Sequence, residues 1–363
     1  MLGLKIIDKY ILKRYIATFS VMILLFIPIG ITIDVSEKVN KMIENKVPIG
    51  PIIQYYLDFT VYFANLLFPI FLFLSIIWFT SKLANNTEII AILSSGISFT
   101  RFLRPYIIGA TLVSLFSLFM GFFLLPKASE GFNNFRYTYL IGGGQNEMRD
   151  NSDVYRQITK DEYIYVSNFN SASQTAFNFS LEKFDNDKLQ YKITASRIQY
   201  NTKQKNFTMF DYKKRKVGEL SDILEAAEKK DTVFSFDLED LTPVVYIAET
   251  LNYTQLTKFI EKERARGSSN IDTYLVVLYK KFSLPVSAFI LTIIAVAVSS
   301  MKRRGGMGMN LAIGILLAFC FIFIDKIFGV LASKSSVPPI IAVWIPNIVF
   351  GILAVYLLRN AKR

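Results

Sequence analysis

The chain has 363 residues, of which 52% are hydrophobic, and it contains 32 Phe and 19 Tyr. A soluble protein of this size could not bury so much apolar surface, so the composition favours a membrane protein. The formal net charge is +12, and the sequence contains no His and a single Cys, Cys320. Disulfides, zinc sites, thiol nucleophiles and His-based catalysis are therefore excluded, and we expect no catalytic residue, no metal and no cofactor.

Six long apolar stretches each have about the 20 residues that a helix needs to cross a membrane. The first is too long for the core of a signal peptide, and no small-residue cleavage site follows it. Basic residues gather at the two ends of the chain and in alternate connections between the stretches. The positive-inside rule then predicts cytoplasmic termini, and this distribution explains the net charge without a nucleic-acid partner. The stretches cover residues 15–33, 55–80, 102–125, 282–300, 311–328 and 340–358.

The first span is predicted to be part of a longer helix. Residues 6–14, ahead of the span, are basic and amphipathic, which is typical of an interfacial anchor. After the span, Val35, Val39 and Met42 recur at helical spacing. The helix is therefore expected to continue above the membrane until Pro48 stops it.

The segment 81–100, between the second and third spans, contains a short apolar run. Asn85, with Glu88 three residues later, fits a capping box, and Gly96 fits the glycine that ends a helix. The two-turn helix between them is too short to cross a membrane and too apolar to lie bare in water. Two interpretations stay open: the helix docks into a groove of a partner protein, or it lies flat on the inner leaflet.

The polar region from Pro126 to Asp272 has the pattern of a strand-rich domain. Its short aromatic and β-branched runs, separated by turn residues, favour an antiparallel sandwich or jelly roll. A helix over 254–266 is predicted to follow, capped by Asn252-Tyr253-Thr254. Gly142-Gly143-Gly144 lacks the rest of a phosphate-binding loop and is predicted to be a flexible turn. The predicted strands cover residues 154–158, 163–168, 177–184, 189–194, 196–200 and 207–212.

Four polar residues lie within the apolar stretches: Asp58, Asn65, Asp325 and Lys326. Charged groups inside a membrane are costly and usually functional, but those near the end of a span reach water. A role in a transport path and a role in packing both stay open. The sequence contains no Walker A motif, so energised transport would draw on another subunit or on an ion gradient.

Several short motifs follow one another in an order that is specific when taken together. They are Phe68-Pro69, Asn85-Asn86-Thr87-Glu88-Ile89-Ile90-Ala91 with Ser95-Gly96, Leu103-Arg104-Pro105, Leu125-Pro126-Lys127-Ala128, Tyr279-Lys280-Lys281-Phe282 with Pro285, and Arg303-Arg304-Gly305-Gly306. In this order, and in the arrangement of three spans, an outer domain and three spans, the chain resembles the LptF/LptG (YjgP/YjgQ) permeases, the membrane subunits of the lipopolysaccharide exporter. The stretch Val337-Pro338-Pro339-Ile340-Ile341, with Pro346, resembles LptG more than LptF.

The resemblance implies a permease subunit of an ABC transporter that extracts lipopolysaccharide from the inner membrane and has no enzymatic activity of its own. It implies that the short helix between the second and third spans is a coupling helix. This helix would dock into a groove of an LptB-like ATPase dimer. Glu88 would match the acidic contact of the family, and the rest of the docking surface would be Ile89, Ile92, Leu93 and Gly96.

The resemblance also implies how the lipid is handled. The first and fifth spans would form lateral gates with a second LptF/LptG-like permease, and the outer jelly roll would pass the lipid to an LptC-like bridge protein in the periplasm. Lys38 would lie near the basic residues of the family that meet the phosphates of lipid A. A substrate with several acyl chains and phosphates needs an apolar cavity rimmed by cations. We therefore expect Lys38, Lys41, Lys280 and Lys281, near the outer ends of spans, to contact the lipid head group.

The predicted fold is a membrane α-helical protein of six spans with an inserted all-β, jelly-roll-like domain in the periplasm and both termini in the cytoplasm. Two other classes remain: a polytopic scaffold or adaptor with a periplasmic binding domain, and an ion-coupled secondary transporter. The transporter would use Asp58, Asp325 and Lys326 as a relay and would need discontinuous helices, which the sequence does not indicate. The predicted divisions are 1–125 (N-terminal membrane half, with the short helix at about 85–96), 126–253 (β domain), 254–272 (connecting helix) and 273–363 (C-terminal membrane half).

Overall fold

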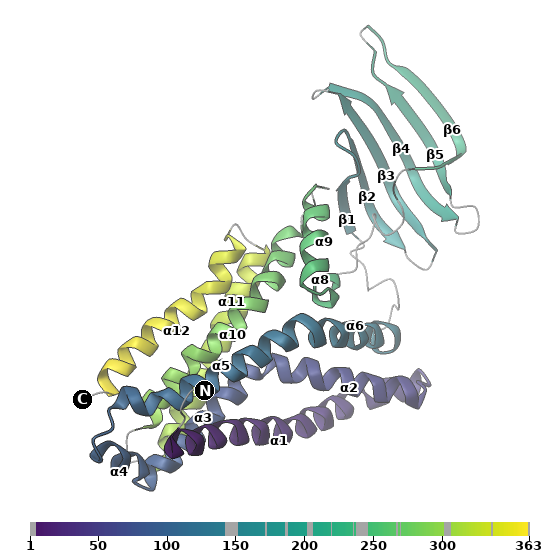
Figure 1. The fold of residues 1–363 in the computed structure, drawn as a ribbon. Coiled ribbons are helices and arrows are strands. Elements are labelled where there is room, and N and C mark those ends of the chain that lie inside the picture. The colour runs from purple at the N-terminus through teal and green to yellow at the C-terminus, as the bar shows by residue number, and fades with distance from the viewer. Residues whose placement is uncertain are drawn as a thin grey trace. The chain divides into compact units, whose positions relative to one another are not determined.

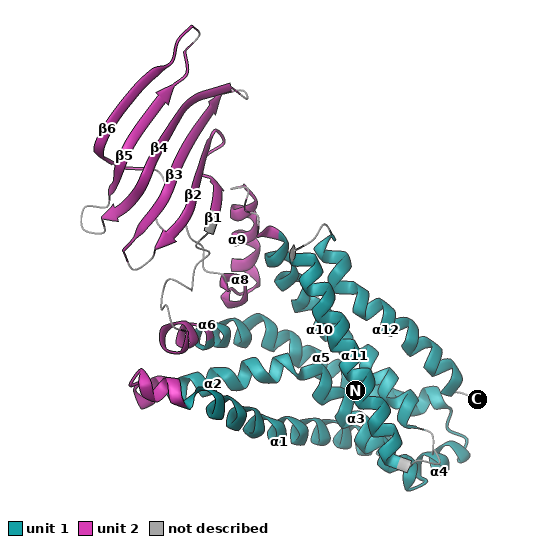
Figure 2. Cartoon of the chain, turned by 180° about the vertical axis from the view of Figure 1, so that it is seen from behind, with its two compact units in different colours: residues 1–39, 52–132, 272–363 teal, residues 40–51, 133–271 magenta. Residues whose placement is uncertain are grey.

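The chain divides into two compact units, which Figure 2 draws in different colours. Unit 1 comprises Met1–Val39, Ile52–Phe132 and Asp272–Arg363, and unit 2 comprises Asn40–Pro51 and Asn133–Ile271. The predicted turn at Gly142–Gly144 and most of the Arg303–Gly306 motif lie outside the described residues. The structure, a computed structural model, describes residues 5–141, 152–170, 173–185, 188–201, 206–218, 220–234, 236, 246–265, 268, 270–300, 306–334 and 337–361.

In the described part of the chain, six helical segments have the length and hydropathy to cross a membrane, which confirms the six predicted spans. Figure 1 shows these helices together with the inserted sheet. The six segments are α1 (Ile6–Glu44), α3 (Phe68–Asn85), the joined stretch Phe99–Leu140, α10 (Ile271–Ser299), α11 (Gly306–Lys334) and α12 (Pro339–Ala361).

Helix α1 is longer than its apolar stretch at both ends, as the sequence predicts. It begins in the basic amphipathic segment and ends at Glu44, four residues before Pro48. Lys46 adopts a left-handed conformation (φ 48°) that turns the chain into α2 (Ile49–Leu66). Pro28 lies inside the helix and removes one backbone donor, and the Thr32 hydroxyl donates to the Pro28 carbonyl at 2.8 Å.

The second apolar stretch, which the sequence presents as one helix, is interrupted. Helix α2 ends at Leu66, Leu67 forms a turn, and α3 begins at Phe68 with Pro69 in its first turn. A proline has no N–H to donate and its ring disfavours a helical residue before it, so a helix starts at this position more readily than it passes through. The expectation of continuous spans was wrong here, because hydropathy averages over a single break.

The third span also differs from its apolar stretch, because the helix continues well beyond residue 125. Helix α5 (Phe99–Phe119) passes into a π-helical turn η1 (Met120–Leu124), then α6 (Leu125–Phe135) and a second π-helical turn η2 (Arg136–Leu140). Pro126 is the second residue after η1, and a π-helical turn rearranges the hydrogen bonds that a proline would otherwise break.

The core of unit 1 lies around α3 and α10, which are the most buried spans. In their most apolar windows 72% and 67% of the residues are buried, compared with 11% for α1 and 22% for α11. Small residues allow close approach of helices: a Cβ added at Gly314 of α11 would lie 2.3 Å from the Ile77 side chain of α3. Helices α1 and α11 therefore surround this core and leave long apolar faces exposed.

Unit 2 contains one antiparallel sheet, which confirms the inserted β domain. Its strands are neighbours in the order of the chain, so the sheet is a six-stranded meander. The expected sandwich or jelly roll has two facing sheets, whereas the described strands form one. The strands are β1 (Ser152–Gln157), β2 (Glu162–Asn170), β3 (Thr175–Asp185), β4 (Lys188–Asn201), β5 (Asn206–Lys216) and β6 (Ile223–Thr232).

Two strands differ from the sequence-based expectation. Strand β4 joins the predicted runs 189–194 and 196–200 into one strand, and β6 was missed because it is charged and mostly exposed. Charge suits an edge strand, since it discourages pairing with foreign strands. On β6, the hydrogen bond from Lys230 holds the pKa of the Glu225 carboxyl below its usual value.

The connection from the sheet back to unit 1 contains α8 (Ile247–Thr250) and α9 (Tyr253–Ala265). The predicted cap at Asn252 is confirmed: its side chain accepts from the Gln255 N–H at 2.9 Å, and the Gln255 side chain accepts from the Asn252 N–H at 3.1 Å. Helix α9 is tied to β1 by an ion pair between Arg156 and Glu263, 3.6 Å apart and only 4% exposed on each side chain.

Breaking this pair should loosen α9. Replacing Arg156 by Met removes the buried ion pair, and we expect a loss of about 3 kcal/mol in local stability. The double variant Arg156→Met/Glu263→Leu should recover much of the loss, because both charges are then gone. Hydrogen exchange of the full chain in detergent, followed by mass spectrometry of the α9 and β1 peptides, measures the effect. Lys183→Met, which removes a more exposed pair with Glu162, is the control and should change exchange little.

Candidate functional site

The short helix α4 (Glu88–Ser94) joins α3 to α5 at one end of unit 1 (Figure 1). The predicted capping box is wrong, because Asn85 is the last residue of α3. Thr87 precedes α4 in a left-handed conformation (φ 62°), which is unfavourable for a β-branched residue. The predicted stop is confirmed: Gly96 adopts φ 87°, and its N–H donates to the Leu93 carbonyl at 3.1 Å.

The apolar side chains of α4 point in two directions. Ile89 is 1% exposed and belongs to the core of unit 1, and Ile92 and Leu93 are partly buried against the same core. Ile90 is 51% exposed, and Ala91 and Ser94 are exposed beside it. Sequence reasoning named Ile89 and did not name Ile90. Helical periodicity assigns both to an apolar helix, and only the packing against α3 and α5 tells them apart.

The carboxylate of Glu88 is held by the chain itself. The Tyr10 hydroxyl of α1 donates to Glu88 Oε2 at 3.0 Å, and the Asn86 amide donates to Oε1 at 3.1 Å. Both oxygens are therefore oriented while the side chain stays partly exposed. Nothing in the sequence spacing indicates the contact to Tyr10, because the two residues are 78 positions apart.

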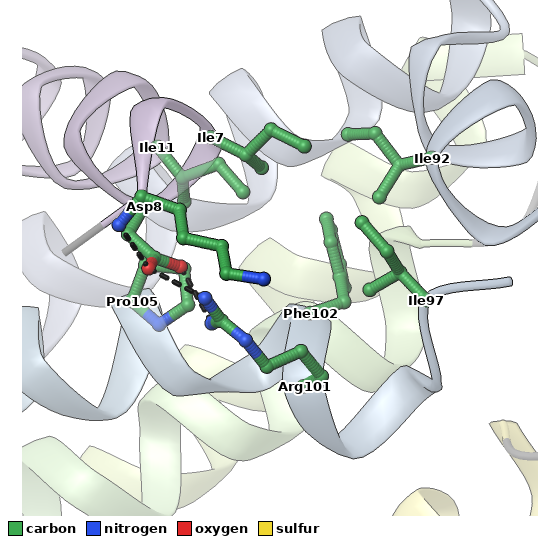
Figure 3. Close-up of a pocket in the computed structure, with 9 residues that line it drawn as sticks. Ile7, Asp8, Ile11, Ile92, Ile97, Arg101, Phe102 and Pro105 are labelled. Carbon is green, nitrogen blue, oxygen red and sulfur yellow. Dashed lines mark hydrogen bonds and ion pairs between the residues drawn. The ribbon is translucent and has the colours of Figure 1, made fainter. Parts of the chain in front are cut away.

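A second contact between α1 and the α4–α5 region lies directly beside α4 (Figure 3). Arg101 of α5 forms a bidentate ion pair with the buried Asp8 of α1: its two terminal guanidinium nitrogens donate to the two carboxylate oxygens at 2.6 and 2.7 Å. The Lys5 backbone N–H donates to the same carboxylate at 2.9 Å. Ile92 and Phe102 lie across from this pair in a small pocket. One face of the amphipathic start of α1, with Asp8 and Ile11, is thus packed against protein, while Ile6 and Tyr10 are exposed.

At the other end of α1, Lys38 is enclosed in a cluster of polar and aromatic side chains. Its ammonium forms an ion pair with Asp34 one turn earlier and donates to the Tyr55 hydroxyl of α2 at 2.8 Å. The Tyr55 hydroxyl donates to the other oxygen of Asp34 at 3.0 Å. The ammonium also lies 5.5 and 5.9 Å from the ring centroids of Tyr55 and Phe132. Lys41, one turn further, donates to the Leu140 carbonyl at 3.2 Å.

The two lysines of α10 have different partners. Lys280 forms an ion pair with Asp325 of α11 at 2.7 Å, with both side chains about one-third exposed (32% and 27%). Lys281 is buried and donates to the Gly121 carbonyl of η1 at 2.9 Å. A π-helical turn leaves carbonyls available for such bonds. All four lysines predicted to contact the head group therefore have a partner within the chain.

The other polar residues of the apolar stretches are not brought together as a relay. Asp58 accepts from the Gln54 amide at 3.1 Å within α2 and lies against Gly131, where an added Cβ would be 2.0 Å from its carboxylate. Asp325 is paired with Lys280, and the neighbouring Lys326 is exposed. Contacts within the chain therefore explain both carboxylates: Asp58 packs against Gly131, and Asp325 forms an ion pair with Lys280.

The described chain has six apolar spans, an inserted antiparallel sheet and a short, partly exposed helix between two spans. These features define a polytopic membrane protein with the layout of a transport permease. The chain matches the family described as "Lipopolysaccharide export system permease LptF/LptG" over residues 9–360. It belongs to this family, and it is therefore a multi-pass inner-membrane protein and a transport subunit of lipopolysaccharide export. The family match does not separate LptG from LptF. No curated protein gives a significant match.

The Asp8–Arg101 pair should contribute measurably to the docking of α1. We expect Asp8→Arg and Arg101→Asp each to lower the thermal stability of the purified chain, since each places like charges together. The exchange variant Asp8→Arg/Arg101→Asp should restore part of the loss, and the double-mutant cycle should give a favourable coupling energy between the two positions. Asp8→Arg/Arg104→Asp is the matched control, and equal rescue by this variant would contradict a specific pair.

Proposed function

We propose that this chain is the permease subunit of an ABC-type exporter that removes lipopolysaccharide from the inner membrane, powered by an LptB-like ATPase dimer and working with a second LptF/LptG-like permease. The observation that carries the proposal is the family match over residues 9–360, nearly the whole chain. Both termini and α4 are cytoplasmic in this proposal, and the sheet is periplasmic. The basic residues near the ends of the spans support this orientation.

The ATPase docks on α4. A transporter subunit without a nucleotide site must receive motion through a surface element, and α4 combines an acidic side chain with an exposed apolar one at a bend between two spans. Glu88, held by Tyr10 and Asn86, presents its charge in a fixed orientation. Ile90 provides the apolar contact, while Ile89 and Leu93 anchor the helix to unit 1. Gly96 ends the helix so that α5 can turn away.

The lateral openings lie along α1 and α11. These two helices are the least buried among the long spans of unit 1, and both carry rows of exposed large apolar residues. Such faces must meet lipid or another protein, and a second permease of similar layout covers them in the closed state. Acyl chains that enter between the subunits gain about 0.8 kcal/mol for each buried CH₂.

The lysines on α1 and α10 recognise the head group, and the sheet receives the lipid. Lys38, Lys41, Lys280 and Lys281 supply cations beside apolar surface, which fits a substrate with phosphates and acyl chains. The sheet has an apolar core on one face, built around Val166, Ile198 and Met209. From there the lipid passes to an LptC-like bridge protein.

The docking of the ATPase is tested on α4. We expect Glu88→Arg and, separately, Ile90→Asp to abolish co-purification of the ATPase from mild detergent, because the first reverses the oriented charge and the second puts a charge into the apolar contact. The second permease should still co-purify with both variants. Glu228→Arg, an equal charge change on the exposed strand β6, is the control and should retain both partners. Full recovery of the ATPase with both α4 variants would reject this surface.

The head-group role of the lysines is tested by neutral substitution. Lys38→Gln/Lys41→Gln should reduce the stimulation of ATPase activity by lipopolysaccharide about tenfold in the reconstituted complex, because two charge-assisted contacts to phosphate are lost, while basal activity stays unchanged. Lys9→Gln/Lys13→Gln makes the same charge change at exposed positions at the start of the same helix and should leave stimulation intact. Equal stimulation in the two double variants would contradict the proposed contact.

A further inference from the structure

Two of the four head-group lysines are neutralised by a carboxylate of the chain. Lys38 is paired with Asp34, and Lys280 is paired with Asp325 at 2.7 Å. The other two lysines, Lys41 and Lys281, donate instead to neutral backbone carbonyls. The side chains of Lys38 and Lys280 are partly exposed, at 22% and 32%.

The two aspartates have a physical reason to be there when no lipid is bound. An ammonium beside apolar, membrane-facing surface is costly unless an anion compensates it. Asp34 is held by two contacts, from the Lys38 ammonium and from the Tyr55 hydroxyl, and is itself buried. It is therefore fixed in place, while Lys38 sits on a flexible stem between Asp34 and the outside.

We propose that Asp34 and Asp325 are resident counter-ions that stand in for the phosphates of the lipid, so that head-group binding is an exchange of partners at Lys38 and Lys280. This inference rests on the proposed function and adds two residues that set specificity. A phosphate displaces the aspartate because it carries more charge and three acceptor oxygens. A lipid without phosphate has no anion to replace the aspartate, so the lysine–aspartate ion pair stays formed.

The exchange of partners lowers the apparent affinity of the protein for the lipid phosphate. A lysine held by its aspartate is available to phosphate only in the fraction of molecules in which the pair is open, and the apparent affinity falls by that fraction. Removing the carboxylate removes the competitor. The aspartate variants should therefore bind a phosphorylated lipid more tightly than the wild type, which is the opposite of what loss of a structural ion pair would do.

The contacts around Lys38 suit both the state in which it is paired with Asp34 and the state in which it is bound to phosphate. Its ammonium lies over the rings of Tyr55 and Phe132, and these cation–π contacts do not depend on Asp34. They keep the lysine at the same place when its carboxylate partner is replaced. Lys41, one turn away, donates to a backbone carbonyl and not to a carboxylate, and it binds phosphate without an exchange.

The test measures lipid binding to the intact complex in nanodiscs, with two probes that share their acyl chains: bisphosphorylated lipid A and the same lipid after dephosphorylation. The variants are Asp34→Asn, Asp325→Asn and the double variant, and Asp34→Glu is the conservative control that keeps a carboxylate. We expect each single Asn variant to bind bisphosphorylated lipid A about fivefold more tightly, the double variant more tightly still, and the dephosphorylated lipid to bind unchanged. Asp34→Glu should behave like the wild type.

A second measurement, the shift in melting temperature on adding lipid, compares each variant with itself and therefore also applies to a variant that is less stable than the wild type. The rise in melting temperature on adding bisphosphorylated lipid A should be larger for Asp34→Asn than for the wild type, because the lipid then restores a missing counter-ion. Equal or weaker binding of the phosphorylated lipid in both Asn variants, with the phosphate preference of the wild type intact, would overturn the exchange and leave the proposed function standing. A wild type that does not distinguish the two lipids would overturn the exchange together with the head-group role of the lysines.

Discussion

The compensation of charge inside an apolar body is the constraint on which the functional features of unit 1 depend. A helix that faces lipid cannot carry a bare cation, so each lysine placed beside the apolar faces of α1 and α10 needs a partner within reach. The chain provides two kinds of partner. Asp34 and Asp325 supply opposite charge, and backbone carbonyls near the π-helical turns supply dipoles. The irregular helix η1 is therefore tied to the same constraint, because its Gly121 carbonyl receives the buried Lys281.

The end of unit 1 that carries α4 is subject to a different constraint, because a seven-residue helix lacks the stability that length gives. Helix α4 is too short to be stable alone, and it depends on packing. Ile89 fixes it to the core, and the start of α1 closes over it through Tyr10 and the neighbouring Asp8–Arg101 pair. Part of the apolar surface of α4 is buried by the chain itself, and a smaller part, centred on Ile90, is exposed. The choice left open by the sequence, between a partner groove and the membrane surface, therefore concerns only this smaller exposed part.

The sequence predicts the features that depend on composition and local chemistry, and it misses those that depend on packing. Six spans, the inserted β domain, the stop at Gly96 and the cap at Asn252 follow from hydropathy, alternation and known capping geometry. The break at Leu67 was missed because one proline hardly changes the hydropathy of a stretch, and β6 was missed because an edge strand has little to bury. The lysines could be named as cations, but the partners of Lys280 and Lys281 lie on helices distant in sequence. The pairing with Asp325 and the contact to Gly121 therefore required the fold.

Helix α1 runs without a break from the contact with α4 to the Lys38 cluster. Tyr10, which contacts Glu88, and Lys38, which is paired with Asp34, lie on one helix and are about 42 Å apart at 1.5 Å per residue. In the proposed function, a displacement of α4 by an ATPase would therefore act on the same helix that holds Lys38. Pro28 lies between the two ends and removes one hydrogen bond of the helix, so bending is easiest there. Because the Asp34–Lys38 pair is internal to α1 and completed by Tyr55 of α2, a shift of α1 relative to α2 would weaken the enclosure of the lysine without breaking the helix. In the proposed function, force applied at α4 and competition by phosphate would then act on the same ion pair, Asp34–Lys38.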